Sequence, residues 1–418
     1  MGVWKFDRFS LLVAFFSSFS LYLLFYVFSW CFSLGFFGLY YCFDSVGLYL
    51  VFLTFVILVS VLFLKPWFGA GSFYVLVVSQ IFSIFCYLCC HALFFWIFYE
   101  MSLVPLLYLL IKDSPYSERY TAFWYFLGYI VFCSLPMFLV VLFFSKGFGG
   151  FSLVNWCVDE EENGILFFLG LLFVTKIPLF PFHTWLPIVH AEASSVVSVC
   201  LSGYIMKLGL LGVFRFCYFI IDDVLFLVEY VGFIVLLSSF FVLCSGFELD
   251  CKRWLAFLSL AHIVVVPLCL NVGEFVDYSI GFCYCLGHGL SSSFAFILFW
   301  FMSEVVGSRN WFFLKSCVVD SFVFQVMVVS CFCLCGSFPF CLQFFCELGV
   351  ICFSGFFSGL LFYSFCVYLF FSGLVPLVCL GFLLVRRQSV SVSVSFEAGP
   401  LLVLFFLFLL NLCSFLFF

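Results

Sequence analysis

Apolar runs of about 20 residues follow one another along almost the whole chain, separated by short polar segments. A helix needs about 20 residues to cross about 30 Å of hydrocarbon. The runs lie at 10–32, 47–64, 73–111, 121–144, 164–190, 193–217, 224–247, 254–272, 279–304, 318–358, 359–385 and 400–418. The run at 73–111 is long enough for two helices. The pattern predicts an all-α polytopic membrane protein with about 13 to 14 transmembrane helices.

Composition excludes several other classes of protein. With 67% hydrophobic residues and 9% charged residues, the chain is too apolar for a soluble globule. A net charge of -6 without a basic patch excludes nucleic acid as a partner. The 24 cysteines lie mainly in apolar runs, without the spacing of a zinc or iron–sulfur site. We therefore expect them to be buried apolar side chains.

Processing and orientation are less strongly indicated by the sequence. The first residues lack an Arg-rich, Ser-rich presequence and a small-residue cleavage site, so we expect the N-terminus to be retained. Phe, Val, Gly, Cys, Ser and Leu abound, as a T- and G-rich coding strand in an organellar genome would produce. Most loops carry only one or two Lys or Arg residues, so the positive-inside rule does not determine the orientation.

Few charged residues lie inside the apolar runs. Glu100, Lys207 and Glu347 lie mid-run, and Lys176 follows the run ILFFLGLLFVT just before a proline. Because a charge at the bilayer centre costs about 3 kcal/mol, such residues are candidates for ion transfer. The alternatives are a structural ion pair for Glu100 and, for Lys207, a side chain that reaches out to the membrane interface.

Two histidines also lie within predicted spans. His262 is in LAFLSLAHIVVVPL and His288 is in CYCLGHGLSSSFAF. An imidazole takes up and releases a proton near neutral pH, so both are candidates for proton transfer. The alternative for each is a packing residue whose hydrogen bonds are satisfied. His91 lies at a junction between two apolar runs and is a weaker candidate.

Two apolar runs contain helix breakers. The segment KIPLFPFHTWLP has three prolines in twelve residues, Pro178, Pro181 and Pro187. Prolines remove backbone donors and disfavour helix at the preceding residue. The segment GSFPFCLQFFCEL places Gly336 and Pro339 ahead of Glu347. Two interrupted helices at corresponding places of two halves are typical of transporters built from repeats.

These charged residues, histidines and helix breakers lie in segments that resemble a known family. The run KIPLFPFHTWLPIVHAEASSVVSVCLSGYIMKLGLLGVFRF (176–216) is similar to the signature of the antiporter-like subunits of respiratory complex I, which is K-x-P-x-x-P-x-H-x-W-L-P-x-A-H followed by L-x-x-x-x-L-K-x-G-x-x-G-x-x-R. The segments 94–111, 248–268, 286–309 and 336–350 resemble the subunit 4 type of that family. Glu347 favours this type, because the subunit 5 type carries lysine there. Ala193-Ser194 replaces the Ala-Pro pair of the family.

The resemblance implies a fold and a domain organisation. It implies two inverted five-helix repeats, each with a broken helix, flanked by further helices. The implied divisions are 1–90 for N-terminal helices, 91–217 for the first repeat with its break near 176–190, 218–372 for the second repeat with its break near 318–350, and 373–418 for C-terminal helices.

The resemblance also implies roles for the candidate residues. Glu100 and Lys176 would form an acid–lysine pair, and Lys207 would be the central protonatable lysine. His262 and His288 would join Lys207 to Glu347, the terminal carboxylate.

The implied function is proton translocation in the membrane arm of an NADH:ubiquinone oxidoreductase of the mitochondrial inner membrane. The chain has no G-x-G-x-x-G motif after a strand and no cysteine set for a cluster, so NAD, FMN, iron–sulfur clusters and ubiquinone are expected in partner subunits. Neighbouring antiporter-like subunits and the lipid bilayer are the expected partners. Two alternatives stay open, namely an Mrp-type sodium/proton antiporter subunit and a purely structural membrane subunit.

Overall fold

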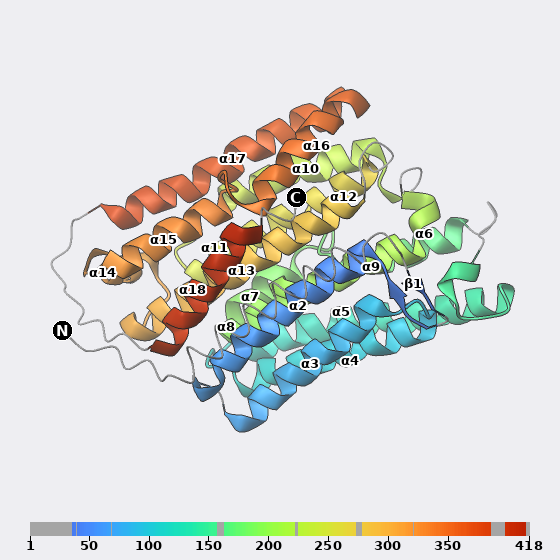
Figure 1. Cartoon of the computed structure of the whole chain (residues 1–418), viewed down its shortest axis with the longest axis horizontal. Coiled ribbons are helices and arrows are strands. Elements are labelled where there is room, and N and C mark those ends of the chain that lie inside the picture. The colour runs from blue at the N-terminus through green and yellow to red at the C-terminus, as the bar shows by residue number, and fades with distance from the viewer. Residues whose placement is uncertain are drawn as a thin grey trace.

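The computed structural model describes residues 36–38, 40–67, 69–156, 163–221, 225–272, 278–320, 322–385 and 398–414. It confirms a polytopic bundle of α-helices whose long axes run side by side (Figure 1). In these ranges, nine helical segments are long and apolar enough to cross a membrane. The predicted span at 10–32 lies outside the described residues.

Seven of these segments are single α-helices. They are α2 (Ser45–Phe63), α3 (Ala70–Leu88), α4 (Ala92–Lys112), α5 (Arg119–Gly147), α10 (Val228–Ser245), α13 (Ser279–Val306) and α17 (Gly359–Leu384). The apolar run at 73–111 is divided between α3 and α4, as its length predicted. Two more segments join consecutive helices, namely α8 (Ser195–Cys200), the π-helical turn η4 (Leu201–Ile205) and α9 (Met206–Phe216), and then α11 (Cys251–Ile263) and α12 (Val265–Asn271).

Shorter elements complete the described part of the chain. The remaining α-helices are α6 (Asn163–Lys176), α7 (Trp185–Glu192), α14 (Trp311–Asp320), α15 (Phe322–Cys335), α16 (Leu342–Phe357) and α18 (Ala398–Cys413). Three single turns are η1 (Lys65–Trp67), η2 (Leu153–Asn155) and η5 (Tyr218–Ile220). The strands β1 (Phe36–Phe37) and β2 (Cys42–Phe43) pair antiparallel.

Both predicted helix interruptions are present. Residues 177–184 separate α6 from α7, and residues 336–341 separate α15 from α16. The backbone groups that the first break frees still find partners, since Trp185 Nε1 donates to the Thr175 carbonyl at 3.1 Å. In the second break Ser337 and Phe340 have φ of 50° and 79°, a left-handed conformation that few residues adopt. Ser337 is buried, as irregular backbone at membrane depth ordinarily is, whereas Phe340 is exposed.

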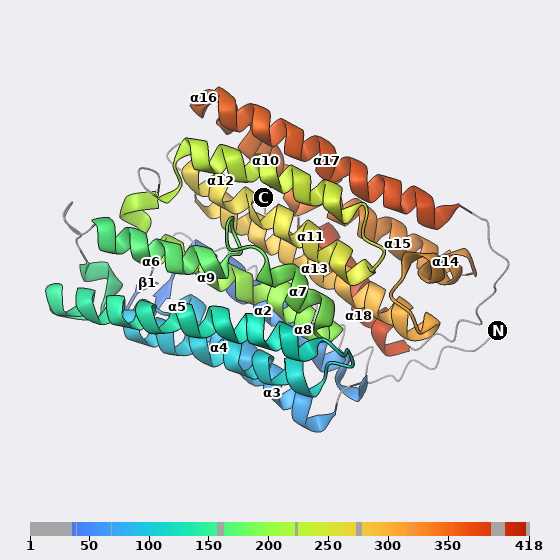
Figure 2. The same cartoon turned by 180° about the vertical axis from the view of Figure 1, so that it is seen from behind.

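Helix α13 lies at the centre of the bundle. It packs against α2, α8, α11, α15, α16 and α18. Helices α3, α4 and α5 lie along one side of the molecule, and α10 and α17 lie along the opposite side (Figures 1 and 2). The segments 195–216 and 251–271 are almost wholly buried between these sides. The implied divisions at 90, 217 and 372 remain predictions, and the last falls within the continuous helix α17.

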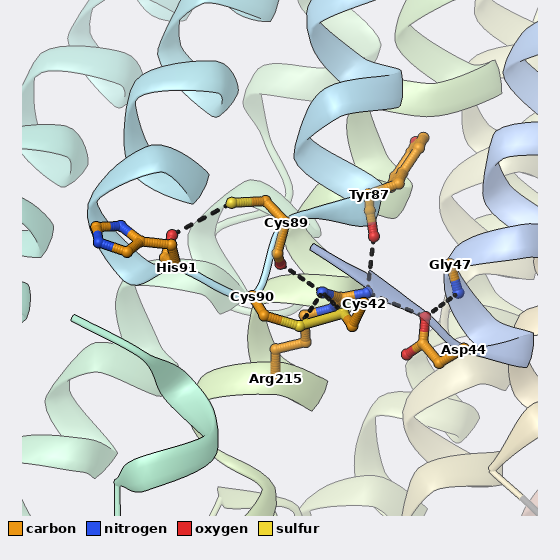
Figure 3. Close-up of a disulfide and its surroundings, with 8 residues drawn as sticks. All are labelled: Cys42, Asp44, Gly47, Tyr87, Cys89, Cys90, His91 and Arg215. Atoms are coloured by element: carbon orange, nitrogen blue, oxygen red, sulfur yellow. Dashed lines mark hydrogen bonds and ion pairs between the residues drawn. A yellow bond between two sulfur atoms is a disulfide. The ribbon is translucent and has the colours of Figure 1, made fainter. Parts of the chain in front are cut away.

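The helices alternate in direction, so their ends gather at two ends of the bundle. One end, which we call the cysteine end, contains a Cys42–Cys90 disulfide that joins the start of α2 to the connection between α3 and α4 (Figure 3). Arg215 of α9 donates there to the carbonyls of Cys89 and Tyr87 and pairs with Asp44 at 3.1 Å. This disulfide corrects the expectation that the cysteines serve only as buried apolar side chains. Cys42 lies in β2 and Cys90 in the connection between α3 and α4, and backbone pairing brings the two segments together, since Cys90 N donates to the Tyr40 carbonyl at 2.9 Å.

The opposite end, which we call the basic end, gathers most of the described lysines and arginines that lie near helix ends. These residues are Lys65, Lys112, Arg119, Lys252, Arg253, Arg309 and Lys315. Only Lys146 and Arg215 lie near helix ends at the cysteine end within the described residues. The two ends therefore differ in their number of lysines and arginines, although no single loop shows the difference.

Candidate functional site

Lys207 is fully buried at the start of α9. Its Nζ donates to the Ser202 carbonyl, which belongs to the preceding π-helical turn. Such a turn is wider than an α-helical one and often occurs at functional sites. Nζ also lies 3.0 Å from His288 Nδ1. Lys207 is therefore in direct hydrogen-bond contact with a histidine from another helix.

Helix α13 presents a polar line toward this lysine. Tyr284, His288 and Ser291 are four and three residues apart, a spacing that puts them on one face of the helix. Ser291 Oγ donates to Gln343 Oε1 of α16 at 3.1 Å. The His288 and His262 ring centroids are 5.7 Å apart. The two predicted histidines are thus neighbours, although they come from different helices.

The contacts of His262 fix its neutral tautomer. Its Nε2 lies 3.1 Å from the Cys335 carbonyl, which the end of α15 leaves free. Because a carbonyl can only accept, Nε2 carries the proton and Nδ1 is the acceptor. Tyr368 OH lies 2.6 Å from Nδ1 and Tyr284 OH lies 3.1 Å from it. Tyr368 is therefore the better donor to His262, and Tyr284 is free to donate elsewhere.

Glu347 of α16 accepts the hydrogen bond that Tyr284 is free to donate. Its Oε1 accepts from Tyr284 OH at 3.3 Å and from Ser337 Oγ at 2.9 Å. Ser337 belongs to the second helix break, so the break supplies one of the two donors. The side chains from Lys207 to Glu347 thus form a nearly continuous line, whose one gap lies between the two imidazole rings.

Glu100 and Lys176 form a second, separate group. Lys176 ends α6, where the helix dipole favours a cation. Its Nζ donates to the Tyr129 carbonyl at 3.3 Å and lies 5.6 Å from the centre of the Tyr99 ring. The charges of Glu100 and Lys176 act on each other, but the two groups are not within the 4 Å of an ion pair. Glu100 Oε1 is buried and has no hydrogen-bond partner among the described residues.

Four of the six predicted site residues therefore lie in one line, and the other two lie beside it. Between the two groups the backbones approach closely: a Cβ added at Gly209 of α9 would lie 3.3 Å from the Lys176 Cβ. The described residues contain no hydrogen bond that joins Lys176 to Lys207. The part of the chain that the structure describes also contains no group of three or more His, Cys, Asp or Glu that could hold a metal ion.

Sequence reasoning missed three residues of the line, which are Tyr284, Tyr368 and Ser337. Tyr284 is four residues before His288, so helical spacing could have found it. Ser337 lies next to a predicted break. Tyr368 carries no sequence signal, because it is one of 20 tyrosines and lies in an otherwise apolar run.

Comparison with known proteins gives a consistent result. The family described as "NADH:quinone oxidoreductase/Mrp antiporter, TM" matches residues 90–375. NADH-ubiquinone oxidoreductase chain 4 of Rhipicephalus sanguineus is 29% identical over 252 residues, which are 59% of this chain and 57% of that protein. Chain 4 of Locusta migratoria is 31% identical over 52% of this chain and 49% of its own length. The matched part thus spans about half of these relatives.

Solved structures share the fold at lower identity. A chain of respiratory complex I from Thermus thermophilus with bound NADH has a TM-score of 0.80 at 20% identity, over 90% of this chain and 82% of that one. A chain of the Mrp complex from Dietzia sp. DQ12-45-1b has a TM-score of 0.71 at 14% identity, over 88% and 73% of the two chains. Because the family model matches well over half of the residues, this chain belongs to the NADH:quinone oxidoreductase/Mrp antiporter family of membrane proteins.

Proposed function

We propose that this chain is a proton-translocating membrane subunit of an NADH:ubiquinone oxidoreductase, respiratory complex I. The observation that carries the proposal is the buried line of proton-exchanging side chains from Lys207 to Glu347. The family membership and the relatives named NADH-ubiquinone oxidoreductase chain 4 support it. Those relatives are eukaryotic, and the residue usage fits an organellar genome, so we assign the chain to the mitochondrial inner membrane as a multi-pass protein.

The proton path would begin at Lys207. Burial disfavours the charged form of a lysine, and His288 Nδ1 at 3.0 Å is within the range of direct proton transfer. When Nδ1 of a neutral imidazole accepts a proton, the ring can release the proton on Nε2. One water between His288 and His262 would complete the next step across the 5.7 Å between ring centroids.

The path would continue through tyrosine hydroxyls. A hydroxyl accepts one proton and donates another, so it transfers a proton without becoming charged. After His262 gains a proton at Nδ1, that nitrogen can donate it to Tyr284 OH at 3.1 Å, while Tyr284 OH passes its own proton to Glu347 Oε1 at 3.3 Å. Glu347 would then receive the proton at the end of the line.

Glu100 and Lys176 would control this line through their charges. When Glu100 is close, its carboxylate stabilises the proton on Lys176. A change that weakens this pair would make Lys176 release its proton toward Lys207. The close packing of Gly209 on Lys176, where an added Cβ would lie 3.3 Å from the Lys176 Cβ, gives the two lysine regions a common packing surface.

Electron transfer would take place in partner subunits that hold NAD, FMN, iron–sulfur clusters and ubiquinone. Neighbouring antiporter-like subunits of the membrane arm and the bilayer itself would surround this chain. Its role would be to move protons in response to redox chemistry elsewhere in the complex.

An Mrp-type sodium/proton antiporter subunit is the second candidate, and the likeness to the Dietzia Mrp chain favours it. The two functions differ in their partners. In a native gel of mild-detergent membrane extract, a complex I subunit migrates in a very large band that stains for NADH oxidation. Migration in a small band without flavin or iron–sulfur subunits would favour the antiporter, and sodium-dependent proton flux would then be measured.

Lys207→Ala tests the central role of this lysine. We expect the complex to assemble and proton translocation through this chain to be abolished, because no other side chain donates to His288 Nδ1 among the described residues. The measurement is the proton-to-electron ratio of the complex in liposomes. An unchanged ratio in an assembled Lys207→Ala complex would rule the role out.

A purely structural role makes a different prediction for the acid–lysine pair. If Glu100 and Lys176 only fix helix packing, the double substitution Glu100→Gln with Lys176→Met leaves the proton-to-electron ratio intact. Under the proposal that ratio falls, because the charges that control Lys207 are lost.

A further inference from the structure

His190 is a buried histidine that the proposed path does not use. It lies on α7, the second half of the first broken helix, and its side chain is fully buried. Its ring stacks on Phe296 of α13, with 5.3 Å between ring centroids and 10° between planes. Stacking holds the face of the ring and leaves both nitrogens at its edge. Neither Nδ1 nor Nε2 has a hydrogen-bond partner among the described residues.

Two unpaired nitrogens in such a buried ring point to a ligand. A neutral imidazole has one donor and one acceptor, and leaving both unpaired costs free energy. Buried polar groups that find no protein partner are ordinarily bonded to ordered water. Water on both edges of His190 would give the ring one proton donor and one proton acceptor.

The surroundings of His190 place it between two lysines. The charges of Lys252 and Lys207 both act on its imidazole. Phe296 is two turns of α13 from His288, which is about 12 Å along the helix toward the basic end. His190 therefore lies on the basic-end side of the Lys207–His288 contact.

Lys252 belongs to a cavity at the basic end. It lies in the first turn of α11 and lines a cavity of about 340 Å³ together with Asp113, Ser194 and Ser195. Its Nζ donates to the Ala193 carbonyl at 3.1 Å and to Tyr116 OH at 3.3 Å. Burial raises the pKa of Tyr116, so this loop hydroxyl stays neutral near neutral pH. The cavity thus reaches the start of α8, which directly follows α7, the helix that holds His190.

We propose that His190 carries protons from this cavity at the basic end to Lys207, a role that rests on the proposed function. A neutral His190 accepts a proton from a water on the cavity side through one ring nitrogen. It releases the proton of its other nitrogen to a water on the Lys207 side. One proton moves, and exchange of the ring tautomer restores the starting state.

The two lysines give this step a direction. A positively charged Lys207 repels a second proton on His190, whereas a neutral Lys207 does not. His190 therefore accepts a proton after Lys207 has passed its own proton to His288. We call His190 the inlet, because protons enter through it. The inlet is then coupled to the line from Lys207 to Glu347 without any movement of a helix.

His190→Gln tests the inlet. Glutamine keeps a donor and an acceptor for water but does not take up a proton, so a merely structural role survives the change. In assembled complexes in liposomes, we expect the proton-to-electron ratio of His190→Gln to fall to that of Lys207→Ala. His91→Gln is the matched control, because His91 lies in the connection at the cysteine end and should keep the ratio of the unchanged protein.

The outcomes separate the inlet from the proposed function. If Lys207→Ala lowers the ratio and His190→Gln does not, His190 is not the inlet and the proposed function stands. If neither Lys207→Ala nor His190→Gln lowers the ratio, the proposed function is wrong, and the role of His190 that rests on it is wrong as well. Where His190→Gln does not assemble, His190→Phe keeps the stacking on Phe296 and is judged by the same two results.

Discussion

At the scale of single residues, the site depends on which atom donates and which accepts. The Cys335 carbonyl sets the neutral tautomer of His262. In that tautomer Nδ1 can accept a hydrogen bond from Tyr368 or Tyr284, and it can donate to Tyr284 only after the ring gains a proton. Among the described residues, Tyr284 is the one whose side chain hydrogen-bonds with both His262 and Glu347. A hydroxyl that sequence analysis overlooked therefore closes the line between predicted residues.

Tyr284→Phe should interrupt the line while keeping its shape. Loss of a buried hydrogen bond costs about 1–3 kcal/mol, so we expect proton translocation to slow about 5- to 150-fold. Tyr363→Phe is the control, since Tyr363 lies on α17 with 71% of its surface exposed. The initial rate of proton uptake into liposomes measures both variants. Equal rates would show that protons bypass Tyr284.

The candidate residues themselves could be predicted from the sequence, because a charge in an apolar run is conspicuous. Their partners could not. Tyr284 and Tyr368 meet His262 across 22 and 106 residues of sequence, and only the packing of α11, α13 and α17 brings them together.

At the scale of elements, the two broken helices supply free backbone groups next to buried titratable residues. At the first break the Trp185 indole donates to the free Thr175 carbonyl near the end of α6, and it takes no part in the proposed proton path. In the second break the freed carbonyl of Cys335 contacts His262, and Ser337 contacts Glu347. The breaks thus position side chains as well as interrupt helices.

Gly209→Val tests the contact between α9 and the first break. A Cβ at Gly209 would lie 3.0 Å from Ile177 Cγ1 and 3.3 Å from the Lys176 Cβ, so the larger side chain must displace Lys176. We expect the proton-to-electron ratio to fall, with a smaller effect for Gly209→Ala. Gly373→Val on α17 is the control, because a Cβ there meets no atom within 4 Å. A ratio that Gly209→Val leaves unchanged would show that Lys176 need not keep its position.

At the scale of the whole molecule, the two ends of the bundle differ in chemistry. The described cations near helix ends concentrate at the basic end, and a disulfide lies at the other. Positive residues favour the inner side of a membrane, and disulfides persist in oxidising compartments. Both rules give the same orientation, with the basic end facing the inner, reducing side.

Labelling of intact membranes tests this orientation. We expect a membrane-impermeant maleimide added from the outer side to label Cys42 and Cys90 only after reduction. Cys244 lies near the basic end of α10 and should be labelled only in inverted vesicles. Peptide mapping without reductant should recover Cys42 linked to Cys90. Free thiols at both positions in untreated membranes would contradict the disulfide, and labelling from the inner side would contradict the orientation.

The sequence by itself determined the class of protein, the sites of helix interruption and most of the titratable residues of the line. Those features depend on local properties, namely the length of apolar runs, the missing donor of proline and the cost of a buried charge. The tertiary structure decided which of these residues meet, added Tyr284, Tyr368 and His190, and gathered the scattered cations at one end. These outcomes depend on how helices with apolar surfaces all around pack together, which helical periodicity cannot indicate when nearly every face is apolar.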